Sequence, residues 1–575
     1  MPAIAVLTAA SMACAAAATP TVPPPADLVL VHGKILTVDA ADAVAQAIAV
    51  RNGKIVAVGT DEQILKLADG RTQSIDLKGR TATPGLIDSH AHIADGGYGE
   101  LYRLDLKDAA NVAEVVARVK AAVAHSRPGE WVQGDGWDEG KLAERRYVRA
   151  ADLDAVSPDN PVWLEHTTGH YGVGNSVALR LAKISAESTD PAAGTIDRDA
   201  QRRPTGVLKE AAQDRVTALL PAPTAEQRRL AVLRSIENLH REGMTAVKDP
   251  DIEMPTWQAY RQLLDAGRLT EHICVLWHGG TTLESARQAL QVIQSLPKPP
   301  QSLGDGALLS CGAKLYMDGS GGARTAWMYG DWNKNSTAVD QGNTGYPATD
   351  PEVYRKQVRL FHQAGVHVGT HAIGDRGIDW VVDTYAQVLK ETPHVGLRHS
   401  IIHANLPTTH AIDAMATLQK TYDAGYPEVQ PPFMWWIGDN YTGNLGPERS
   451  AHLLPLKTFA AHQVQWTGGS DYFVTPLPAR FGIWAAVERE TLKATYGAHP
   501  FGTAESVDVH AALRAYTAAG ARQLFLEDKI GSIEVGKEAD IAVWDQDMYA
   551  IPASELKNLH CAMTLMHGKV VYRSE

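Results

Sequence analysis

The sequence predicts an α/β protein built on a (β/α)8 barrel, with a small β-sandwich formed by both chain termini. Three observations lead to this prediction. The interior alternates helical patterns with short buried strands, and β-rich segments with turn residues stand at both ends. Polar residues also follow several of the buried strands, at the end of a barrel where enzymes keep their chemistry.

The composition is that of a large globular protein. The chain has 575 residues, of which 45% are hydrophobic and 21% are charged. A net charge of −12 and the lack of any lysine- or arginine-rich run argue against a nucleic-acid partner, because duplex binding needs a basic surface. Beyond the N-terminus, no segment reaches the ~18 apolar residues of a membrane-spanning helix.

The first 26 residues are apolar and rich in small residues, and then become proline-rich. They resemble a bacterial export signal with cleavage options at 15–18, which predicts a periplasmic or secreted protein. No Lys or Arg precedes the apolar run, so a disordered tail on a cytoplasmic protein is the alternative. Cys14 leaves lipidation open. The other cysteines, Cys274, Cys311 and Cys561, are too few and too scattered to predict a disulfide framework.

Residues 27–80 and 526–575 carry the β-rich pattern. Short runs are broken by turns such as Asn52-Gly53, which is typical of hairpins. Because the two segments share this style at opposite ends of the chain, we expect them to form one β-sandwich domain. The barrel, residues 81–525, would then be inserted between them.

Within the barrel region, capping residues and glycines mark the helices. Thr224 and Gln227 form a capping-box pattern, and Gly243 ends the helix that follows. Residues 95–240 exceed what one β/α step requires, so we expect an inserted subdomain that covers part of the site. The eight expected barrel strands are 81–90, 244–249, 272–278, 307–319, 366–371, 398–404, 426–431 and 464–471.

The chemistry-bearing residues lie at the ends of these strands. His90 and His92 are two residues apart, so on a strand both side chains point to the same face and can bind one cation. His371, His403 and Asp471 each close a buried strand. Lys314 lies within an apolar strand, where a lysine is costly unless it is paired or modified. Their convergence at one barrel mouth predicts a metal site.

These residues and their neighbours resemble the amidohydrolase superfamily, and within it the amidohydrolase-3 branch. The resemblance runs from about residue 28 to residue 573. The motifs that carry it are 84–92, 205–210, 314–320, 371–375, 470–471 and 531–540, together with His403. One departure is Ser400-Ile-Ile-His403, where relatives often carry Arg-Ile-Glu-His.

The resemblance implies a binuclear zinc centre. His90, His92 and Asp471 would bind the more buried metal. Lys314, carboxylated by CO2, would bridge to a second metal held by His371 and His403. An unmodified Lys314 beside a single metal stays open as an alternative. Glu210 is either a substitute bridge or a partner in a helix salt bridge.

The implied reaction is hydrolysis of an amide-type C–N bond in a small molecule. The metals would lower the pKa of water toward ~7, and Asp471 would act as general base and then as general acid. A mononuclear deaminase or cyclic-amidine hydrolase is the alternative, although Ala372 follows His371 where a carboxylate partner would favour deamination. A binding protein without turnover is disfavoured, because no ligand is missing.

Four residues are candidates for contact with the substrate: His170, Trp137, Tyr316 and Arg324. Trp137 and Tyr316 lie near predicted loops or strand ends, and ordinary packing is the alternative for each. His170 lies on a predicted insertion loop, and a local turn role is its alternative. Arg324 would bind a substrate carboxylate. The sequence leaves the substrate itself open, and a homodimer is common among such enzymes.

Overall fold

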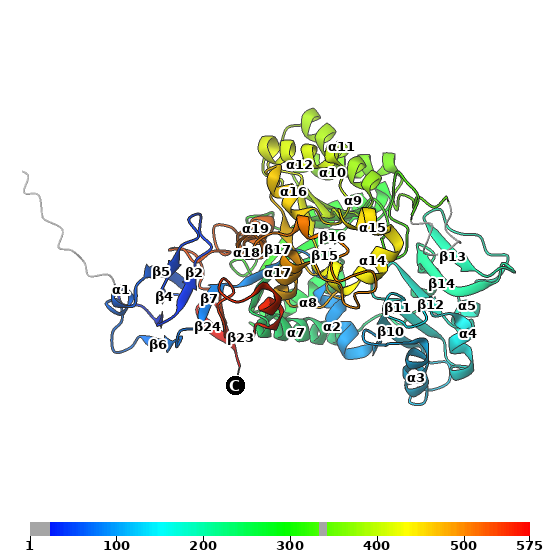
Figure 1. The fold of residues 1–575 in the computed structure, drawn as a ribbon, viewed down its shortest axis with the longest axis horizontal. Helices are drawn as coiled ribbons and strands as arrows, with labels where there is room; N and C mark the ends of the chain where they lie inside the picture. The colour runs from blue at the N-terminus through cyan, green and yellow to red at the C-terminus, as the bar shows by residue number, and fades with distance from the viewer. Residues whose placement is uncertain (1–23, 333–341, 575) are drawn as a thin grey trace, which may run out of the picture.

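The computed structural model describes residues 24–332 and 342–574. The predicted export signal, including Cys14, lies outside them up to residue 23. Along the long axis, Figure 1 shows the terminal strands on one side, the barrel in the centre and a separate strand-rich unit on the other side. No helix among the described residues is long and apolar enough to cross a membrane.

Eight strands form one parallel sheet in the order β21-β20-β19-β18-β17-β16-β15-β8. The two edge strands meet where the backbone N–H of Ser89 donates to the carbonyl of Gly468 at 3.0 Å. The predicted eight-stranded barrel is therefore confirmed. Its strands are β8 (Leu86–Asp88), β15 (Met244–Ile252), β16 (His272–His278), β17 (Leu308–Tyr316), β18 (His367–Ala372), β19 (Ser400–His403), β20 (Tyr426–Val429) and β21 (Thr467–Gly468).

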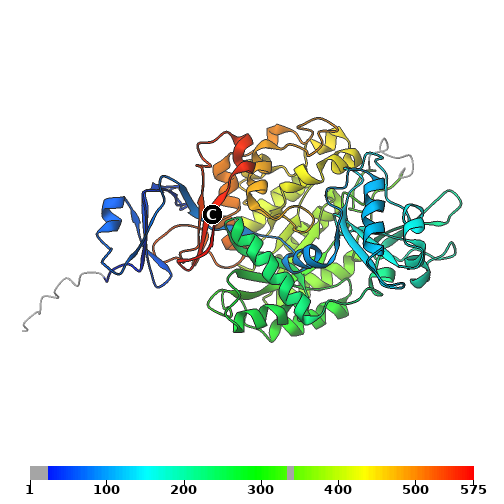
Figure 2. The same cartoon turned by 90° about the horizontal axis from the view of Figure 1, so that it is seen from below.

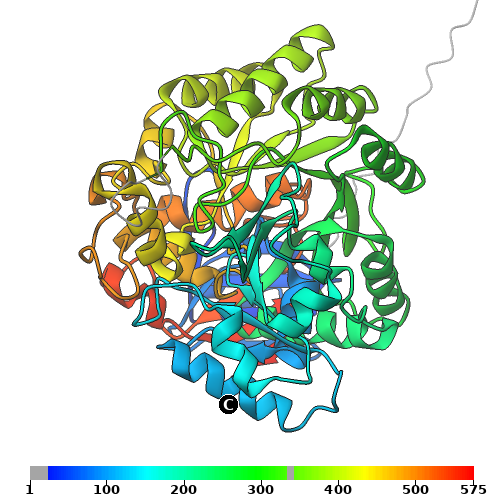
Figure 3. The same cartoon turned by 90° about the vertical axis from the view of Figure 1, so that its right-hand side faces the viewer.

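Helices surround the barrel, as Figure 3 shows when the molecule is viewed along the barrel. The capping box of Thr224 and Gln227 forms as predicted and begins α7. The helices after it are α7 (Ala225–Arg241), α8 (Met254–Asp265), α9 (Leu283–Gln294), α10 (Pro351–Gln363), α11 (Asp375–Glu391), α12 (Thr409–Tyr422), α13 (Pro432–Trp436), α14 (Gly438–Leu445), α15 (Pro447–Ser450), α16 (Leu456–Ala461), α17 (Ala479–Glu488), α18 (Val509–Ala515) and α19 (Ala518–Gln523).

The strand predicted at 81–90 is in fact two strands in different sheets. β7 (Thr81–Pro84) pairs with β22 (Ile541–Trp544) in a terminal sheet, whereas β8 belongs to the barrel. Gly85 lies between them, and a Cβ there would come within 2.1 Å of the Thr245 side chain. The chain therefore crosses from one sheet to the other where only glycine fits.

Both termini contribute to the sheets at the amino ends of the barrel strands. One sheet has the order β5-β4-β1-β6, and the other has the order β24-β23-β22-β7-β2-β3. Side chains from both sheets share one hydrophobic cluster, with Leu30 and Ile48 from the first and Ile541 and Leu565 from the second. The remaining elements are β1 (Leu28–Val31), β2 (Lys34–Leu36), β3 (Val44–Ala45), β4 (Ala47–Arg51), β5 (Lys54–Gly59), α1 (Asp61–Leu65), β6 (Gln73–Asp76), β23 (Cys561–Met566) and β24 (Lys569–Arg573).

Between β8 and α7 the chain leaves the barrel and forms a sheet of order β13-β14-β12-β11-β10-β9. This sheet has its own buried cluster and lies over the end of the barrel opposite the terminal strands (Figures 1 and 3). Its elements are α2 (Ile93–Tyr102), β9 (Leu104–Asp105), α3 (Val112–Val123), β10 (Val132–Trp137), α4 (Ala150–Leu153), β11 (Val162–His166), β12 (Tyr171–Gly174), α5 (Ser176–Leu181), β13 (Gly194–Arg198), β14 (Pro204–Glu210) and α6 (Asp214–Thr217).

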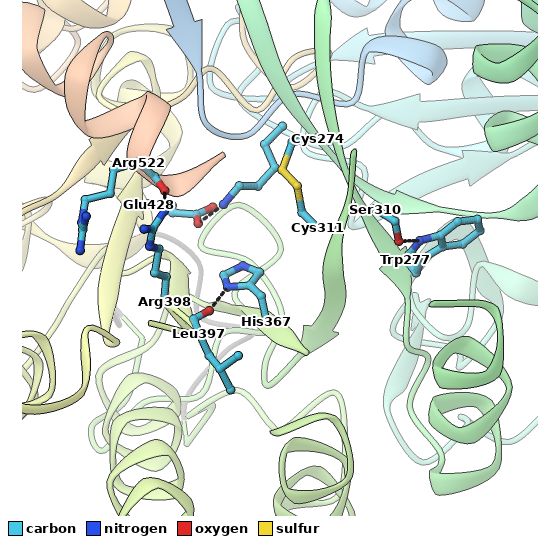
Figure 4. Close-up of a disulfide and its surroundings, with 10 residues drawn as sticks. Cys274, Trp277, Ser310, Cys311, His367, Leu397, Arg398, Glu428 and Arg522 are labelled. Atoms are coloured by element: carbon cyan, nitrogen blue, oxygen red, sulfur yellow. Dashed lines mark hydrogen bonds and ion pairs between the residues drawn. A yellow bond between two sulfur atoms is a disulfide. The ribbon is translucent and has the colours of Figure 1, made fainter. Parts of the chain in front are cut away.

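Two of the cysteines that are scattered along the sequence form a disulfide. Cys274 on β16 and Cys311 on β17 have Cα atoms 5.6 Å apart, although they are 37 residues apart in the chain. Figure 4 shows the bond between the two strands. The sequence missed this pair because parallel strand pairing joins residues that are separated by a whole helix and its loops.

Candidate metal centre

His90 and His92 follow β8, and both face Asp471. Nε2 of each histidine lies 3.3 Å from Oδ1 of Asp471. Asp88 holds this arrangement, because its carboxylate accepts hydrogen bonds from the backbone of His90 at 3.0 Å and from the Ser470 hydroxyl at 2.6 Å. The loops after the first and last barrel strands are thus joined beneath the cluster.

His371 on β18 and His403 on β19 complete the group. Their ring centroids are 4.4 Å apart, and the ring of His403 is 5.3 Å from that of His90. Nε2 of His371 donates to the carbonyl of Gly319 at 3.0 Å, and Nδ1 of His403 donates to Oε1 of Gln430 at 2.7 Å. The opposite nitrogen of each ring is therefore left with a lone pair.

Lys314 is 1% exposed on β17. Its Nζ lies 3.5 Å from Nε2 of His90 and 4.8 Å from the ring centroid of Tyr316. Burial lowers the pKa of Lys314 to about 8, because the protonated amine loses its hydration. The neutral amine is therefore far more accessible here than on an ordinary lysine.

The protonation states suit a cation. Burial holds the pKa of His90 and of His371 well below 6.5 and lowers that of His403 to about 3. Burial alone would raise the pKa of Asp471, but hydrogen bonds from His90 and His92 hold it well below its usual value. Neutral imidazoles and a carboxylate are the forms in which these groups bind metals.

The geometry also fits a cation. Donor atoms of His90, His403 and Asp471 all lie within 4.8 Å of one another. In a tetrahedral zinc site with bonds of about 2.0–2.1 Å, neighbouring ligand atoms are about 3.3 Å apart. The 3.3 Å separations between Asp471 and the two histidines match this spacing. Nδ1 of His90 is buried without a hydrogen bond among the described residues.

A cavity of about 450 Å³ opens above the cluster, between the barrel and the unit formed by 104–210. His170 and Tyr316 line it, as do the five expected metal ligands and Lys314. Glu210 lies in the same wall, where its Oε2 is 2.9 Å from Nδ1 of His170. Glu210 thus pairs with a cavity histidine, and the alternative of a helix salt bridge was wrong.

Trp137 and Arg324 do not line this cavity. Trp137 is fully buried in the core of the unit formed by 104–210, where its indole N–H donates to the carbonyl of Leu164. The guanidinium of Arg324 donates to Asn444 and to the hydroxyl of Tyr147. Both predictions failed because the sequence locates a residue near a strand end without showing which way its side chain points.

Two further residues of the cavity wall, His278 and Asp251, were not predicted from the sequence. Nδ1 of His278, the last residue of β16, is 2.6 Å from Oδ1 of Asp251 on β15. The hydrogen bond with Asp251 raises the pKa of His278 to about 9. Burial alone would raise the pKa of Asp251, but His278 lowers it to about 2. The strand-end rule that selected His371 would also have selected His278.

The fold and the site agree with the family to which the chain belongs. The chain belongs to the amidohydrolase family, whose model matches residues 73–572. It is a hydrolase acting on carbon–nitrogen bonds. The resemblance stated from the sequence is thereby confirmed.

Individual relatives are distant but cover almost the whole chain. The protein is 28% identical to N-substituted formamide deformylase of Arthrobacter pascens, over 95% of this chain and 98% of the relative. It is also 28% identical to the protein LONG AFTER FAR-RED 3 of Arabidopsis thaliana, over 95% and 92%. A crystal structure of an uncharacterized metal-dependent hydrolase from Pyrococcus horikoshii has the same fold, with a TM-score of 0.69 and 24% identity over 92% and 99% of the two chains.

Proposed function

We propose that this protein hydrolyses an amide-type C–N bond of a small molecule that carries no negative charge. The observation that carries the proposal is the position of Asp471, whose Oδ1 lies 3.3 Å from Nε2 of both His90 and His92 at the floor of the cavity. One carboxylate is thus placed both to bind a cation and to exchange protons with a substrate above it.

The ligand set we propose contains two zinc ions. His90, His92 and Asp471 would hold one ion, and His371 with His403 would hold the other. The neutral amine of Lys314 would attack CO2 and lose a proton, which forms a carbamate. This turns a buried cation into an anion that balances the metal charge, and the lowered pKa of Lys314 supports the step.

The proposed mechanism assigns proton transfer to Asp471. When bound, the metal supplies Lewis acidity, which polarises a carbonyl and lowers the pKa of water toward ~7. Asp471 takes a proton from the attacking water and delivers it to the nitrogen of the leaving amine. Its depressed pKa keeps it ionised, which is the form that can accept a proton.

The charges of the cavity wall define the substrate class. Two cationic side chains of the wall are already paired, His170 with Glu210 and His278 with Asp251, and Arg103 behind the wall is paired with Glu165 at 2.7 Å. The carboxylates of Asp95 and Asp214 also line the cavity. With Lys314 converted to a carbamate, an anionic substrate would meet two carboxylates and no unpaired side-chain cation of the wall, so we infer a neutral or cationic amide.

We also propose that the two terminal sheets form a β-sandwich domain of 27–80 and 526–575, and that the protein is exported. Their shared hydrophobic cluster supports the first proposal. The Cys274–Cys311 disulfide supports the second, because disulfides persist in oxidising compartments such as the periplasm.

Metal content and product analysis test the function together. The cluster of His90, His92, His371, His403 and Asp471 should hold about two zinc-like ions per chain, and the His90→Ala/His92→Ala variant should contain fewer ions than the wild type. An N-substituted formamide, the substrate in the name of the Arthrobacter relative, should yield formate and an amine.

One ion at this cluster, with ammonia released from an amine or amidine substrate, would instead establish the deaminase alternative. A protein that takes up no metal would refute both readings.

A further inference from the structure

A second group of metal-binding side chains lies at the opposite end of the barrel. His272 begins β16, Glu538 lies just before β22, and His567 lies in the turn between β23 and β24. Their donor atoms are all within 4.8 Å of one another. The group therefore spans the contact between the C-terminal strands and the barrel. Figure 2 shows these C-terminal strands, in red, between the N-terminal strands and the helices of the barrel.

The spacing in this group repeats that of the catalytic cluster. Oε2 of Glu538 is 3.3 Å from Nε2 of His272 and 3.2 Å from Nδ1 of His567. These separations match the edges of a tetrahedral zinc site, about 3.3 Å. Glu538 is 4% exposed, and its Oε2 has no hydrogen bond of acceptable geometry among the described residues.

The orientation of His272 is that of a metal ligand. Its Nδ1 lies 2.8 Å from the carbonyl of Gly306, so this nitrogen carries the proton. Its Nε2 faces the carboxylates of Glu538, at 3.3 Å, and Asp540, at 2.8 Å. The Nε2–Asp540 contact is a hydrogen bond that needs a proton on Nε2, and a cation bound here would take the place of that proton while the carbonyl of Gly306 keeps the ring oriented.

The local charge also leaves room for a divalent cation. Glu538 and Asp540 supply two negative charges to the group, whereas the nearby carboxylate of Asp305 is offset by Lys529 and Lys54. Lys529 also lies 3.8 Å from Glu538. A divalent cation would neutralise both carboxylates of the group, whereas a proton on His272 would neutralise one.

A third group of possible metal ligands, Asp138, Glu139 and His166, lies in the unit formed by 104–210, but its polar atoms are already hydrogen-bonded to one another. Nδ1 of His166 accepts a hydrogen bond from the backbone of Thr168 at 3.1 Å, so its proton is on Nε2. Nε2 faces Glu139 at 3.2 Å, and the hydroxyl of Tyr171 lies between them. That group is satisfied without a cation.

We propose that His272, Glu538 and His567, with Asp540 as the fourth donor, bind a structural zinc-type cation that fastens the C-terminal strands to the barrel. Two imidazoles with carboxylates are the donor set that zinc accepts. The side chain of His567 is 43% exposed, which gives the ion a path from solvent. This inference is independent of the reaction proposed above.

The test counts zinc in the intact, zinc-loaded and desalted protein at pH 7.5. His567→Ala and Glu538→Gln should each bind one zinc ion fewer per chain than the wild type. His560→Ala removes another exposed histidine next to β23 and should leave the count unchanged. Because His567 is half-exposed, its variant should fold even if the Glu538 variant does not.

Crystals measured at the zinc absorption edge locate the ion. The proposal expects an anomalous peak between His272 and His567 in the wild type and in His560→Ala, with no such peak in His567→Ala. Equal zinc counts in all four proteins, or no peak at this position, would show that a proton on His272 balances the carboxylates and would overturn the proposal. Loss of metal from the catalytic cluster alone would leave this peak in place, so the two sites can be judged separately.

Discussion

In the proposed metal centre of His90, His92, His371, His403 and Asp471, the chemistry depends on which nitrogen of each histidine would face the metal. Gly319 and Gln430 decide this for His371 and His403, because each accepts the proton of the nitrogen that faces away. Neither partner is a metal ligand. Their role is to orient the imidazoles and to keep the metal-facing nitrogens free of protons.

Replacing Gln430 by Leu should therefore weaken metal binding without removing a ligand. The proton on Nδ1 of His403 would lose its acceptor, and the ring would lose its fixed orientation. We expect a metal affinity lower by about 10- to 100-fold, measured by competition with a chromogenic chelator. Gln419→Leu, on the outer helix α12, is the matched control and should bind metal as the wild type does. Equal affinities in both variants would mean that Gln430 does not position His403.

Asp471→Asn should separate proton transfer from metal binding. The amide can still offer an oxygen to a cation, but it cannot accept the proton of water. Turnover should fall by roughly 10²- to 10⁴-fold while the metal content stays near that of the wild type. Steady-state rates and metal analysis of the same sample check this. Full activity in the variant would remove Asp471 from the role assigned here.

At the scale of the secondary-structure elements, the site depends on close contact between α2 and α7. α2 follows His92 directly and carries Asp95 into the cavity wall. At Gly97 its backbone approaches α7 so closely that a Cβ would come within 2.1 Å of the carbonyl oxygen of Ala231. A helix backbone cannot yield as a flexible side chain can, so α2 itself would have to move.

Gly97→Ala should consequently lower both stability and activity. We expect a loss of about 1–3 kcal/mol in the free energy of unfolding, as in other overpacked cores, and a reduced kcat/KM because His92 and Asp95 shift with the helix. Gly70→Ala is the control, since a Cβ at Gly70 would meet no atom within 4 Å. Thermal unfolding and kinetics of both variants make the comparison. A Gly97 variant as stable and active as the control would contradict the rigid contact.

At the scale of the whole molecule, the metal centre joins the first and last strands of the barrel. Asp471 follows β21, His90 and His92 follow β8, and β8 to β21 is where the sheet closes. Three buried imidazoles of lowered pKa lie in one place with the half-buried His92 and a buried carboxylate, an arrangement that favours a cation over added protons. Metal binding should therefore stabilise the folded chain over the unfolded one.

Removing the metal with a chelator should lower the melting temperature, and adding zinc back should restore it. At a free metal concentration about 1,000 times the dissociation constant, binding contributes roughly 4 kcal/mol. Scanning calorimetry of the chelated, reconstituted and His90→Ala/His92→Ala proteins measures the effect. The variant should respond to the chelator less than the wild type. Identical melting curves with and without chelator would show that the fold does not depend on metal.

The sequence by itself determined the barrel and the core of the site. Alternating helix and strand patterns are local, and the ends of parallel strands must meet at one mouth, so His371, His403 and Asp471 could be grouped without coordinates. The motif from Pro84 to His92 added His90 and His92, the remaining proposed ligands.

Only the tertiary structure decided how side chains point and which distant segments touch. Arg324 and Trp137 turn away from the cavity, whereas His278 and Asp251 enter it. The Cys274–Cys311 bond and the contact of His272 with Asp540 join residues 37 and 268 positions apart. Local pattern carries no signal for such pairs, because they depend on strand register and on the packing of one sheet against another.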